Sequence, residues 1–306
     1  MASGNPPWYE TDENGKIMIL EVPARLKFHP EVIRRGLEPS DPSKVGVVYR
    51  TSVLKPPLYY IKIIDTDTEE APIFQRLSRL RDPRNHTIPG ELTSPEAGHP
   101  LLITPAMSDL YALVGLDTSL SHILSAFLQL IEGIEFLHSL RIAHMDISPS
   151  NVLVAGEEIC EQCPDAEPLR VYIIDFGSSR QLPLGPGSQH AITLPPSQYR
   201  PADDDAIFDP YSWDVHCAAL TMKNVMKTYY GNDPPLIARL YVNWLQGNER
   251  GCRTVCRCRP TARSARQVLT GILWGVLVWK RLKSVLFSLI TTPIQLLTHI
   301  PRVRSY

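Results

Sequence analysis

The sequence predicts an α+β fold with two lobes, a small β-rich one followed by a larger and mostly helical one. Runs of β-branched and aromatic residues, broken by Pro and Gly, are concentrated in the first part of the chain. From residue 119 onward, long stretches carry apolar residues at helical spacing. We therefore place the first lobe at about 16–107 and the second at about 108–270.

Composition and charge exclude several other classes of protein. The 306 residues are 43% hydrophobic and 21% charged, which is typical of a chain that folds around a core. A net charge of −1 argues against bulk electrostatic binding, so we expect no nucleic acid partner. Residues 1–15 form a polar tail without the apolar run of a signal peptide, and the six cysteines do not make a disulfide framework. These features predict a cytoplasmic or nuclear protein.

The first lobe is predicted to contain strands and one helix. The strands are expected at 16–22 ("KIMILEV"), 44–50 ("KVGVVYR"), 58–65 ("LYYIKIID") and 101–107 ("LLITPAM"). A helix is predicted over 66–80, because polar residues at its start can cap it and apolar residues follow at helical spacing. Pro72 must then lie near the helix start, where a missing N–H costs least.

The second lobe is predicted to be built from longer helices. Residues 119–140 have apolar side chains at i, i+3, i+4 and i+7 and serines that can cap the helix. Two short strands around a polar loop are expected in 151–177, and further helices at 208–230 and 235–247.

The first lobe contains a lysine that can bind phosphates and, in the following helix, an acid that can hold it. Lys62 alternates with apolar residues in "YYIKIID", so its side chain can point from the strand into a cleft and pair with phosphates. An acid at the start of the following helix, Glu69 or Glu70, can hold that lysine in an ion pair.

Two polar motifs of the second lobe fit the same chemistry. In "HMDISPSN", Asp146 could accept a hydroxyl proton and Asn151 could bind Mg²⁺. In "IIDFG", Asp175 would bind Mg²⁺ that bridges the phosphates of a nucleotide.

In this order, the four pieces resemble the eukaryotic protein kinase family, and the resemblance covers about residues 40–270. More narrowly, "EEAPIFQRL", "NHTIPGEL", "AHMDISPSN", "YIIDFGSSR" and "DPYSWDV" are similar to the divergent kinase-like domains of mushroom-forming (basidiomycete) fungi. Asp214 resembles the aspartate that braces the catalytic loop in that family, and Arg259 resembles the structural arginine of its late "RPT" segment.

The resemblance implies ATP-dependent and Mg²⁺-dependent phosphoryl transfer to Ser or Thr hydroxyls of a protein. The nucleotide-contacting residues would be Lys62, Glu70, Asp175 and Gly177; the catalytic residues Asp146 and Asn151; and the Mg²⁺ ligands Asn151 and Asp175. Glu70 is the favoured partner of Lys62, because the apolar residues that follow it match those after the helix glutamate of the family. The alternative is that Glu69 and Glu70 are both solvated acids favoured by the helix dipole.

Three departures from the family pattern bear on activity. A glycine-rich phosphate loop is not recognisable, since only Gly46 precedes the lysine strand closely. Met145 replaces an arginine that reads a phosphate on the activation loop, and Ser148 replaces the lysine that neutralises the transferring group. Arg180 and Arg200 are candidate substitutes for that lysine, with ordinary loop arginines as the alternative.

The activation-segment acid and the cysteines leave open questions. Pro196–Ser197 or Pro201–Ala202–Asp203 stands where the family has "APE", and the Asp203–Asp205 run is a candidate partner for Arg259. The "CEQC" and "CRTVCRC" segments lack matching zinc spacing, so free thiols are favoured over a metal site.

Two other functions remain as alternatives to the protein kinase. One is a pseudokinase, which binds a nucleotide or serves as a scaffold and is suggested by the missing glycine loop and by Ser148. The other is a small-molecule kinase of the aminoglycoside phosphotransferase type, which shares the His-x-Asp-x₄-Asn loop; "DFG" and "RPT" favour the protein kinase.

The chain ends in a hydrophobic and basic tail, 271–306. Its apolar runs, 268–279 and 284–300, flank "KRLK", and Pro293 interrupts the second. Each run is shorter than the roughly 18–20 residues that span a bilayer. We favour packing on the second lobe or on a partner; the alternative is peripheral membrane contact through 268–300, because the pattern also resembles an interfacial amphipathic segment.

Overall fold

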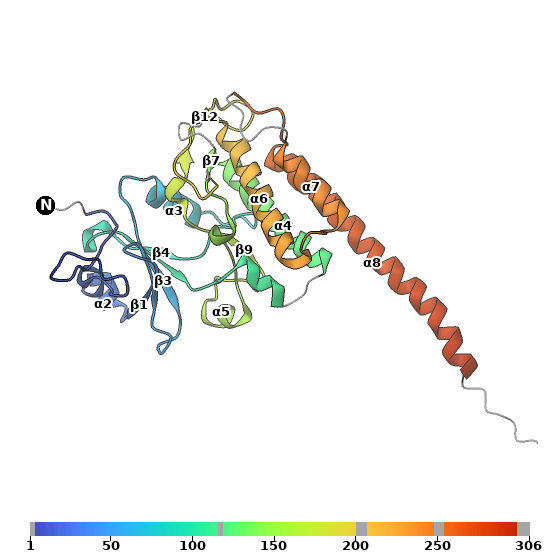
Figure 1. Cartoon of the computed structure of the whole chain (residues 1–306), viewed down its shortest axis with the longest axis horizontal. Coiled ribbons are helices and arrows are strands. Elements are labelled where there is room, and N and C mark those ends of the chain that lie inside the picture. Colours follow the sequence, from blue (N-terminus) through green and yellow to red (C-terminus); the bar gives the residue numbers. More distant parts are fainter. Residues whose placement is uncertain (1–3, 116–118, 200–206, 248–253, 299–306) are drawn as a thin grey trace, which may run out of the picture.

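The computed structural model describes residues 4–115, 119–199, 207–247 and 254–298, and these form the predicted α+β fold. A β-sheet lobe is followed by a helical lobe, and a long C-terminal helix extends away from both (Figure 1).

The first lobe is built on one antiparallel sheet of five strands in the order β1-β2-β3-β5-β4. Its strands are β1 (Pro39–Lys44), β2 (Val48–Thr51), β3 (Tyr59–Ile63), β4 (Glu91–Leu92) and β5 (Leu101–Pro105). Alternation along β3 buries Ile61 and Ile63 on one face of the sheet, so Lys62 between them points to the other face.

The strand predicted at 16–22 is wrong, and the strand predicted at 44–50 is two strands. Residues 16–22 form a bridge and turns, with Ile19 and Leu20 exposed, because no neighbouring strand covers the run. The short helices α1 (Ala24–Lys27) and α2 (Pro30–Arg34) follow instead. At 44–50, Gly46 adopts φ 74° and turns the chain from β1 into β2.

The helix expected over 66–80 is shorter than predicted. Helix α3 spans Glu70–Ser78, and Pro72 lies in its first turn, where no intrahelical partner of its N–H is lost. Ile73, Phe74 and Leu77 pack into the core and fix the rotation of the helix. Glu70 therefore lies at the N-terminal end of α3, beside the sheet.

The second lobe is organised around α4 (Leu120–Ser139), with α6 (Pro210–Tyr230) and α7 (Leu236–Gln246) packed near it. Among the described residues, α4 alone has the length and apolar content of a membrane span, but 56% of that stretch is buried inside the body. We therefore interpret α4 as a core helix. The remaining short elements are β6 (Ser108–Asp109), β7 (Ile142–Ala143), β8 (Val152–Val154), α5 (Glu157–Gln162), β9 (Val171–Ile173), β10 (Arg180–Gln181), β11 (Ile192–Thr193) and β12 (Ile207–Phe208).

The two apolar runs near the C-terminus belong to a single helix. Helix α8 spans Ala262–Thr298 and continues through position 293, where the sequence predicted an interruption. Its first turns pack on α4 and α7, and its remainder leaves the body (Figure 1).

The N-terminal segment is part of the first lobe, although residues 1–15 were predicted to be a polar tail. Trp8 is only 5% exposed, and its indole N–H donates to the carbonyl of Gly4 over 2.9 Å. The Arg25 guanidinium lies 4.0 Å from the Trp8 ring centroid. The backbone N–H of Trp8 donates to the carbonyl of Gly46 over 2.8 Å, so the segment covers the β1–β2 turn.

Replacing Trp8 with Ala should lower the free energy of unfolding by about 3–5 kcal/mol, because a buried aromatic side chain leaves a cavity. Urea denaturation followed by circular dichroism measures this loss. The matched control is Trp244→Ala on α7, where the side chain is 41% exposed and the expected loss is about 1 kcal/mol or less. Equal losses in both variants would show that the segment is not part of the folded lobe.

Candidate active site

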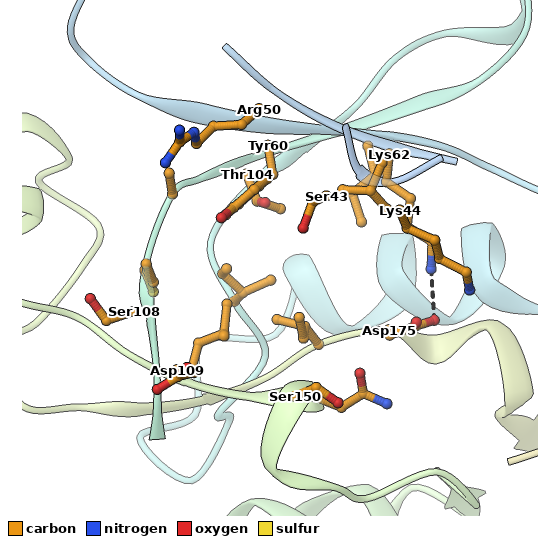
Figure 2. A pocket seen from close by; sticks show the side chains of 18 of the residues that line it. Ser43, Lys44, Arg50, Tyr60, Lys62, Thr104, Ser108, Asp109, Ser150 and Asp175 are labelled. Atoms are coloured by element: carbon orange, nitrogen blue, oxygen red, sulfur yellow. Dashed lines mark hydrogen bonds and ion pairs between the residues drawn. The ribbon is translucent and has the colours of Figure 1, made fainter. Parts of the chain in front are cut away.

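A cavity of about 990 Å³ lies between the sheet and the second lobe. Figure 2 shows Lys44, Lys62 and Asp175 at one end of it and Arg50, Ser108 and Asp109 at the other. Its walls between these ends are apolar and include Val48, Leu102, Met107, Leu153 and Ile174. A second cavity of about 710 Å³ shares the Lys44, Lys62 and Asp175 end and reaches Asp146.

Lys62 is held between two carboxylates at the charged end of the cavity. Its Nζ donates to Oε1 of Glu70 over 2.6 Å and to Oδ1 of Asp175 over 2.7 Å (Figure 2 marks the second bond). Burial acts to lower the pKa of Lys62, but the charges of Asp175 and Glu70 outweigh it and raise that pKa. Lys62 therefore stays cationic in the cleft.

The two carboxylates respond differently to the shared lysine. Burial raises the pKa of Glu70, whose side chain is 2% exposed, and Lys62 only partly opposes this. Burial also acts to raise the pKa of Asp175, but the charge of Lys62, with help from Lys44, lowers it to about 2. Asp175 is 33% exposed and fully ionised at neutral pH, so it is the carboxylate of this pair that can hold a cation in the cavity.

Glu69, the other candidate partner of Lys62, does not reach the lysine. It accepts the backbone N–H of Gln181 over 2.8 Å, and its carboxylate lies 3.8 Å from Nε of Arg180. Glu69 thus ties the start of α3 to β10, while Glu70 faces the cleft.

The turn after β9 places Asp175 by a left-handed backbone conformation. Asp175 has φ 63° and accepts the N–H of Gly177 through Oδ1 over 3.3 Å. A Cβ at position 177 would lie 3.2 Å from that oxygen, so the absence of a side chain leaves room for the carboxylate. Phe176 is buried and its ring lies 5.2 Å from that of His144, which fixes the turn against the second lobe.

Asp146 and Asn151 form a connected pair beside the cavity. The Asn151 side-chain N–H₂ donates to the Asp146 carbonyl over 2.8 Å and to Asp146 Oδ2 over 3.0 Å. Since these bonds use the nitrogen, the amide oxygen remains an acceptor, and among the described residues it accepts no hydrogen bond. Burial raises the pKa of Asp146, while the backbone N–H of Gln198, which donates to Oδ1 over 2.7 Å, opposes the shift.

Asp214, on α6, holds the backbone just before Asp146. Its fully buried carboxylate accepts the N–H groups of His144 and Met145 over 2.8 and 2.6 Å and an N–H of the His138 ring over 2.9 Å. Met145 has φ 63°, a conformation that costs free energy in a residue with a side chain. The contacts with Asp214 therefore stabilise a strained loop that presents Asp146 to the cavity.

Two contributors to the site, Lys44 and Gln198, are absent from the residues predicted from the sequence. Lys44 lines both cavities, and Figure 2 shows it extending toward Asp175 from the end of β1. Among the described residues it forms no ion pair. The prediction of one strand over 44–50 hid the turn that places Lys44 at the cleft. Gln198 left no signal, because it acts on Asp146 through its backbone.

Gly46 does not cover the cavity in the manner of a phosphate loop. A Cβ at this position would lie 2.7 Å from the Tyr9 ring and 2.8 Å from the Trp8 carbonyl. Gly46 is therefore needed for the packing of the N-terminal segment on the β1–β2 turn.

Arg180, one candidate replacement for the missing catalytic-loop lysine, lies beside Glu69 and lines neither cavity. Ser148, which stands where the lysine would be, is buried and its hydroxyl bonds to that of Ser150 over 3.1 Å. Arg200, the other candidate, lies outside the described residues.

Arg259 is held by two hydrogen bonds to described residues. It donates to the Gln246 carbonyl over 2.7 Å and to Oγ of Ser212 over 2.9 Å. The Asp203–Asp205 run, its candidate partner, lies outside the described residues. Arg259 thus ties the segment before α8 to α6 and α7.

The cysteines form no metal site among the described residues. No group of three or more His, Cys, Asp or Glu side chains is close enough to hold an ion there. Sγ of Cys256 and Sγ of Cys258 lie 3.5 Å apart, and Cys160 and Cys163 are free thiols on or next to α5.

Residues 107–198, which contain Asp146, Asn151 and Asp175, match the family model described as protein kinase domain. The chain is 29% identical over 121 residues to serine/threonine-protein kinase par-4 of Caenorhabditis elegans, which covers 38% of this chain and 18% of that protein. It is 34% identical over 95 residues to a serine/threonine-protein kinase of Yarrowia lipolytica, and the match covers 30% of this chain and 12% of that protein. It is 43% identical over 58 residues to serine/threonine-protein kinase/endoribonuclease IRE2 of Homo sapiens, covering 19% and 6%.

The matched segments span less than a fifth of the length of these relatives. The segment that matches the family model contains the catalytic loop and the DFG turn described above. The matched segment is therefore similar to a protein kinase domain, and a β-rich first lobe followed by a helical second lobe is the arrangement of a bilobal kinase fold.

Replacing Asp214 with Ala should lower the free energy of unfolding by about 3 kcal/mol or more, because it leaves two backbone N–H groups and His138 without their buried acceptor. Chemical denaturation measures the change, and Asp67→Ala at an exposed position is the control, with an expected change within about 0.5 kcal/mol. A loss for Asp214→Ala no larger than that of the control would mean that Asp214 does not stabilise the loop.

Proposed function

We propose that this chain transfers the γ-phosphoryl group of ATP, with Mg²⁺, to Ser or Thr hydroxyls of a protein substrate. The observation that carries the proposal is the clamp of Lys62 by Glu70 and Asp175, at the shared end of two cavities, one of which reaches Asn151 and the other Asp146. The relatives named as serine/threonine-protein kinases support the choice of acceptor.

The cavity has the size and lining that a nucleotide requires. A volume of about 990 Å³ lies at the upper end of the range for small-molecule sites. The apolar walls can enclose a flat base, with Val48 and Leu102 from the sheet and Leu153 from the second lobe. The Lys62 ammonium at the far end would bind the phosphates, and Glu70 keeps it in place.

The oxygen ligands of the site suit Mg²⁺. Asp175 offers an ionised carboxylate, and the Asn151 amide has its nitrogen turned toward Asp146 and its oxygen left to accept. Both side chains line the larger cavity. When bound, Mg²⁺ would neutralise charge on the phosphates of the nucleotide.

Asp146 would orient and deprotonate the acceptor hydroxyl. Its carboxylate lines the second cavity, near the phosphate-binding end, and it is held by Asn151 on one oxygen and Gln198 on the other. Because burial raises its pKa, Asp146 is a better proton acceptor than a solvated aspartate once it is ionised.

Single-turnover transfer from ATP·Mg²⁺ to a panel of Ser/Thr peptides tests the proposal. We expect the wild-type chain to transfer phosphate and Asp146→Asn to lose at least about 100-fold in rate, since a general base contributes that much. A thermal-shift titration with ATP and Mg²⁺ should show binding in both proteins.

Two outcomes would replace the proposal. Nucleotide binding without transfer above the level of Asp146→Asn would indicate a pseudokinase, an alternative favoured by the replacement at Ser148. Faster phosphorylation of small amines or sugars than of peptides would indicate an aminoglycoside phosphotransferase type.

Lys44 should compensate in part for the missing glycine loop and for Ser148. Its cationic side chain lines both cavities and helps to lower the pKa of Asp175. Lys44→Ala should therefore weaken ATP·Mg²⁺ binding by about 3–10-fold, as expected for one charge-assisted contact to phosphate.

Isothermal titration calorimetry measures this change in affinity. Lys16→Ala, at an exposed position away from the cavities, is the matched control and should bind as the wild type does. Unchanged affinity in Lys44→Ala would show that Lys44 does not contact the nucleotide.

The proposal extends to the origin and location of the chain. Its similarity to divergent kinase-like domains of basidiomycete fungi supports membership of that group, and the polar N-terminal residues support a cytoplasmic or nuclear location. A net charge of −1 supports protein rather than nucleic acid as the macromolecular substrate.

A further inference from the structure

Helix α8 leaves the body of the protein with apolar side chains that no described residue covers. Beyond its first turns, Trp274 and Trp279 are 69% and 59% exposed, and Leu282 and Val285 are 52% and 57% exposed. Figure 1 shows the helix extending well past the second lobe. Four large apolar side chains on one protruding element form a surface that water does not favour.

An apolar stripe runs along the side of α8 opposite the body. Ala265 and Leu269 are buried and Ile272 and Val276 pack on the core, which gives an inner stripe with spacings of three and four residues. At about 100° per residue, a second stripe falls on the far side of the helix. We call this stripe, Trp274, Val278, Leu282 and Val285, the outer face. Trp279, seven residues after Ile272, falls on the side of the inner stripe, in the part of the helix beyond the body.

The charges of α8 are of one sign. Its 37 residues contain Lys and Arg but no Asp or Glu, whereas the whole chain has 31 basic and 32 acidic residues. Lys280, Arg281 and Lys283 are exposed in the turn that follows Trp279. The Lys283 ammonium lies 5.4 Å from the Trp279 ring centroid, so a cation and an aromatic ring meet on the side of the helix away from the outer face.

We propose that the outer face of α8 lies on an anionic phospholipid bilayer, with the helix in the plane of the interface. Tryptophan side chains beside lysines and arginines are the pattern that binds headgroups and acyl chains together. Long cationic side chains can reach the headgroups while their stems stay against apolar surface. The charged "KRLK" segment interrupts the apolar sequence before it reaches the roughly 20 residues needed to span a bilayer, so the helix lies on the membrane and does not cross it.

A second copy of the chain fits the outer face less well. Two such helices would bring together cations with no acid on α8 to pair with them, whereas anionic headgroups supply the complementary charge. Because the body packs on the opposite side of α8, it stays on the aqueous side when the outer face contacts lipid. This membrane contact does not depend on the proposed enzymatic activity.

Cosedimentation of the full chain with extruded vesicles tests the proposal. We expect binding to phosphatidylcholine vesicles that contain phosphatidylserine, weaker binding to phosphatidylcholine alone, and weakening with added salt. The double variant Trp274→Ser, Leu282→Ser should lose at least about tenfold in partition coefficient, because two apolar anchors of the outer face are removed. Leu236→Ser, Leu240→Ser, which changes two exposed side chains of α7, should bind as the wild type does.

A charge-reversal variant tests the electrostatic part of the same contact. Lys280→Glu, Arg281→Glu, Lys283→Glu should also lose at least about tenfold, since each cation near an anionic surface contributes to binding. The control reverses three exposed cations of the second lobe, Lys223, Lys227 and Arg239. Near-ultraviolet circular dichroism of every variant checks that the body remains folded.

Three results would overturn the proposal. Equal binding to neutral and anionic vesicles would remove the charge argument. Equal losses in the α8 variants and their controls would remove the assignment to α8. The third result is a wild type that binds no vesicles but forms a dimer in light scattering, with the dimer abolished by Trp274→Ser, Leu282→Ser. That result would assign the outer face to a second copy.

Discussion

The ion pairs of Lys62 connect the sheet, helix α3 and the second lobe at the candidate site. Its ammonium joins β3 of the sheet to α3 through Glu70 and to the second lobe through Asp175. Such a buried cation is stable only when its counter-charges are held at the right distance, because the cost of desolvation is otherwise not recovered. The rotation of α3, the turn at Asp175 and the alternation along β3 are therefore not independent features, since each is needed to keep this one charge paired. They also define where a nucleotide phosphate would bind, as a partner that competes with the same carboxylates for Lys62.

The second lobe holds the strained loop that contains Met145 in the conformation that presents Asp146 to the cavity. Met145 has a left-handed backbone, and Asp214 offsets its cost by accepting two consecutive N–H groups. The buried carboxylate of Asp214 needs hydrogen-bond donors, and the N–H groups of His144 and Met145 need an acceptor. The two hydrogen bonds satisfy both groups. The residue at 145 adds apolar burial to this arrangement, where a phosphate-binding arginine would be expected from the family. The loop is thus held by the hydrogen bonds to Asp214 and by the burial of Met145.

The sequence predicted the residues whose identity is tied to chemistry better than it predicted local backbone structure. The two lobes and the meeting of Lys62 with Glu70 and Asp175 followed from motif order, because the roles proposed for these side chains admit few other residue types. The segment 16–22 was predicted incorrectly since its β-branched residues favour a strand only where a neighbouring strand exists, and in the described part of the chain it has only the isolated bridge between Ile17 and Thr11. The burial of Trp8 and the contact from the backbone of Gln198 arise from tertiary packing, to which local pattern gives no access. The start of α3 was misplaced because several polar residues before it were equally suitable as caps.

The packing of the N-terminal segment explains why the β1–β2 turn does not act as a glycine-rich phosphate loop. In a glycine-rich loop, flexible backbone N–H groups can approach phosphates. Here Trp8 and Tyr9 pack against the β1–β2 turn so closely that Gly46 is needed for the contact, and the Gly46 N–H is already used within the lobe, since it donates to the Tyr49 hydroxyl over 3.0 Å. The turn lines the second cavity through the apolar side chains of Val45 and Val47, and the charged side chain beside them is Lys44, at the end of β1. Charge on a flexible side chain can replace oriented backbone amides in attracting phosphate, but it fixes the position of the phosphate less tightly. Under the proposed function, Lys44 would therefore help to attract the nucleotide, and the missing loop would weaken the alignment of the phosphates more than their binding.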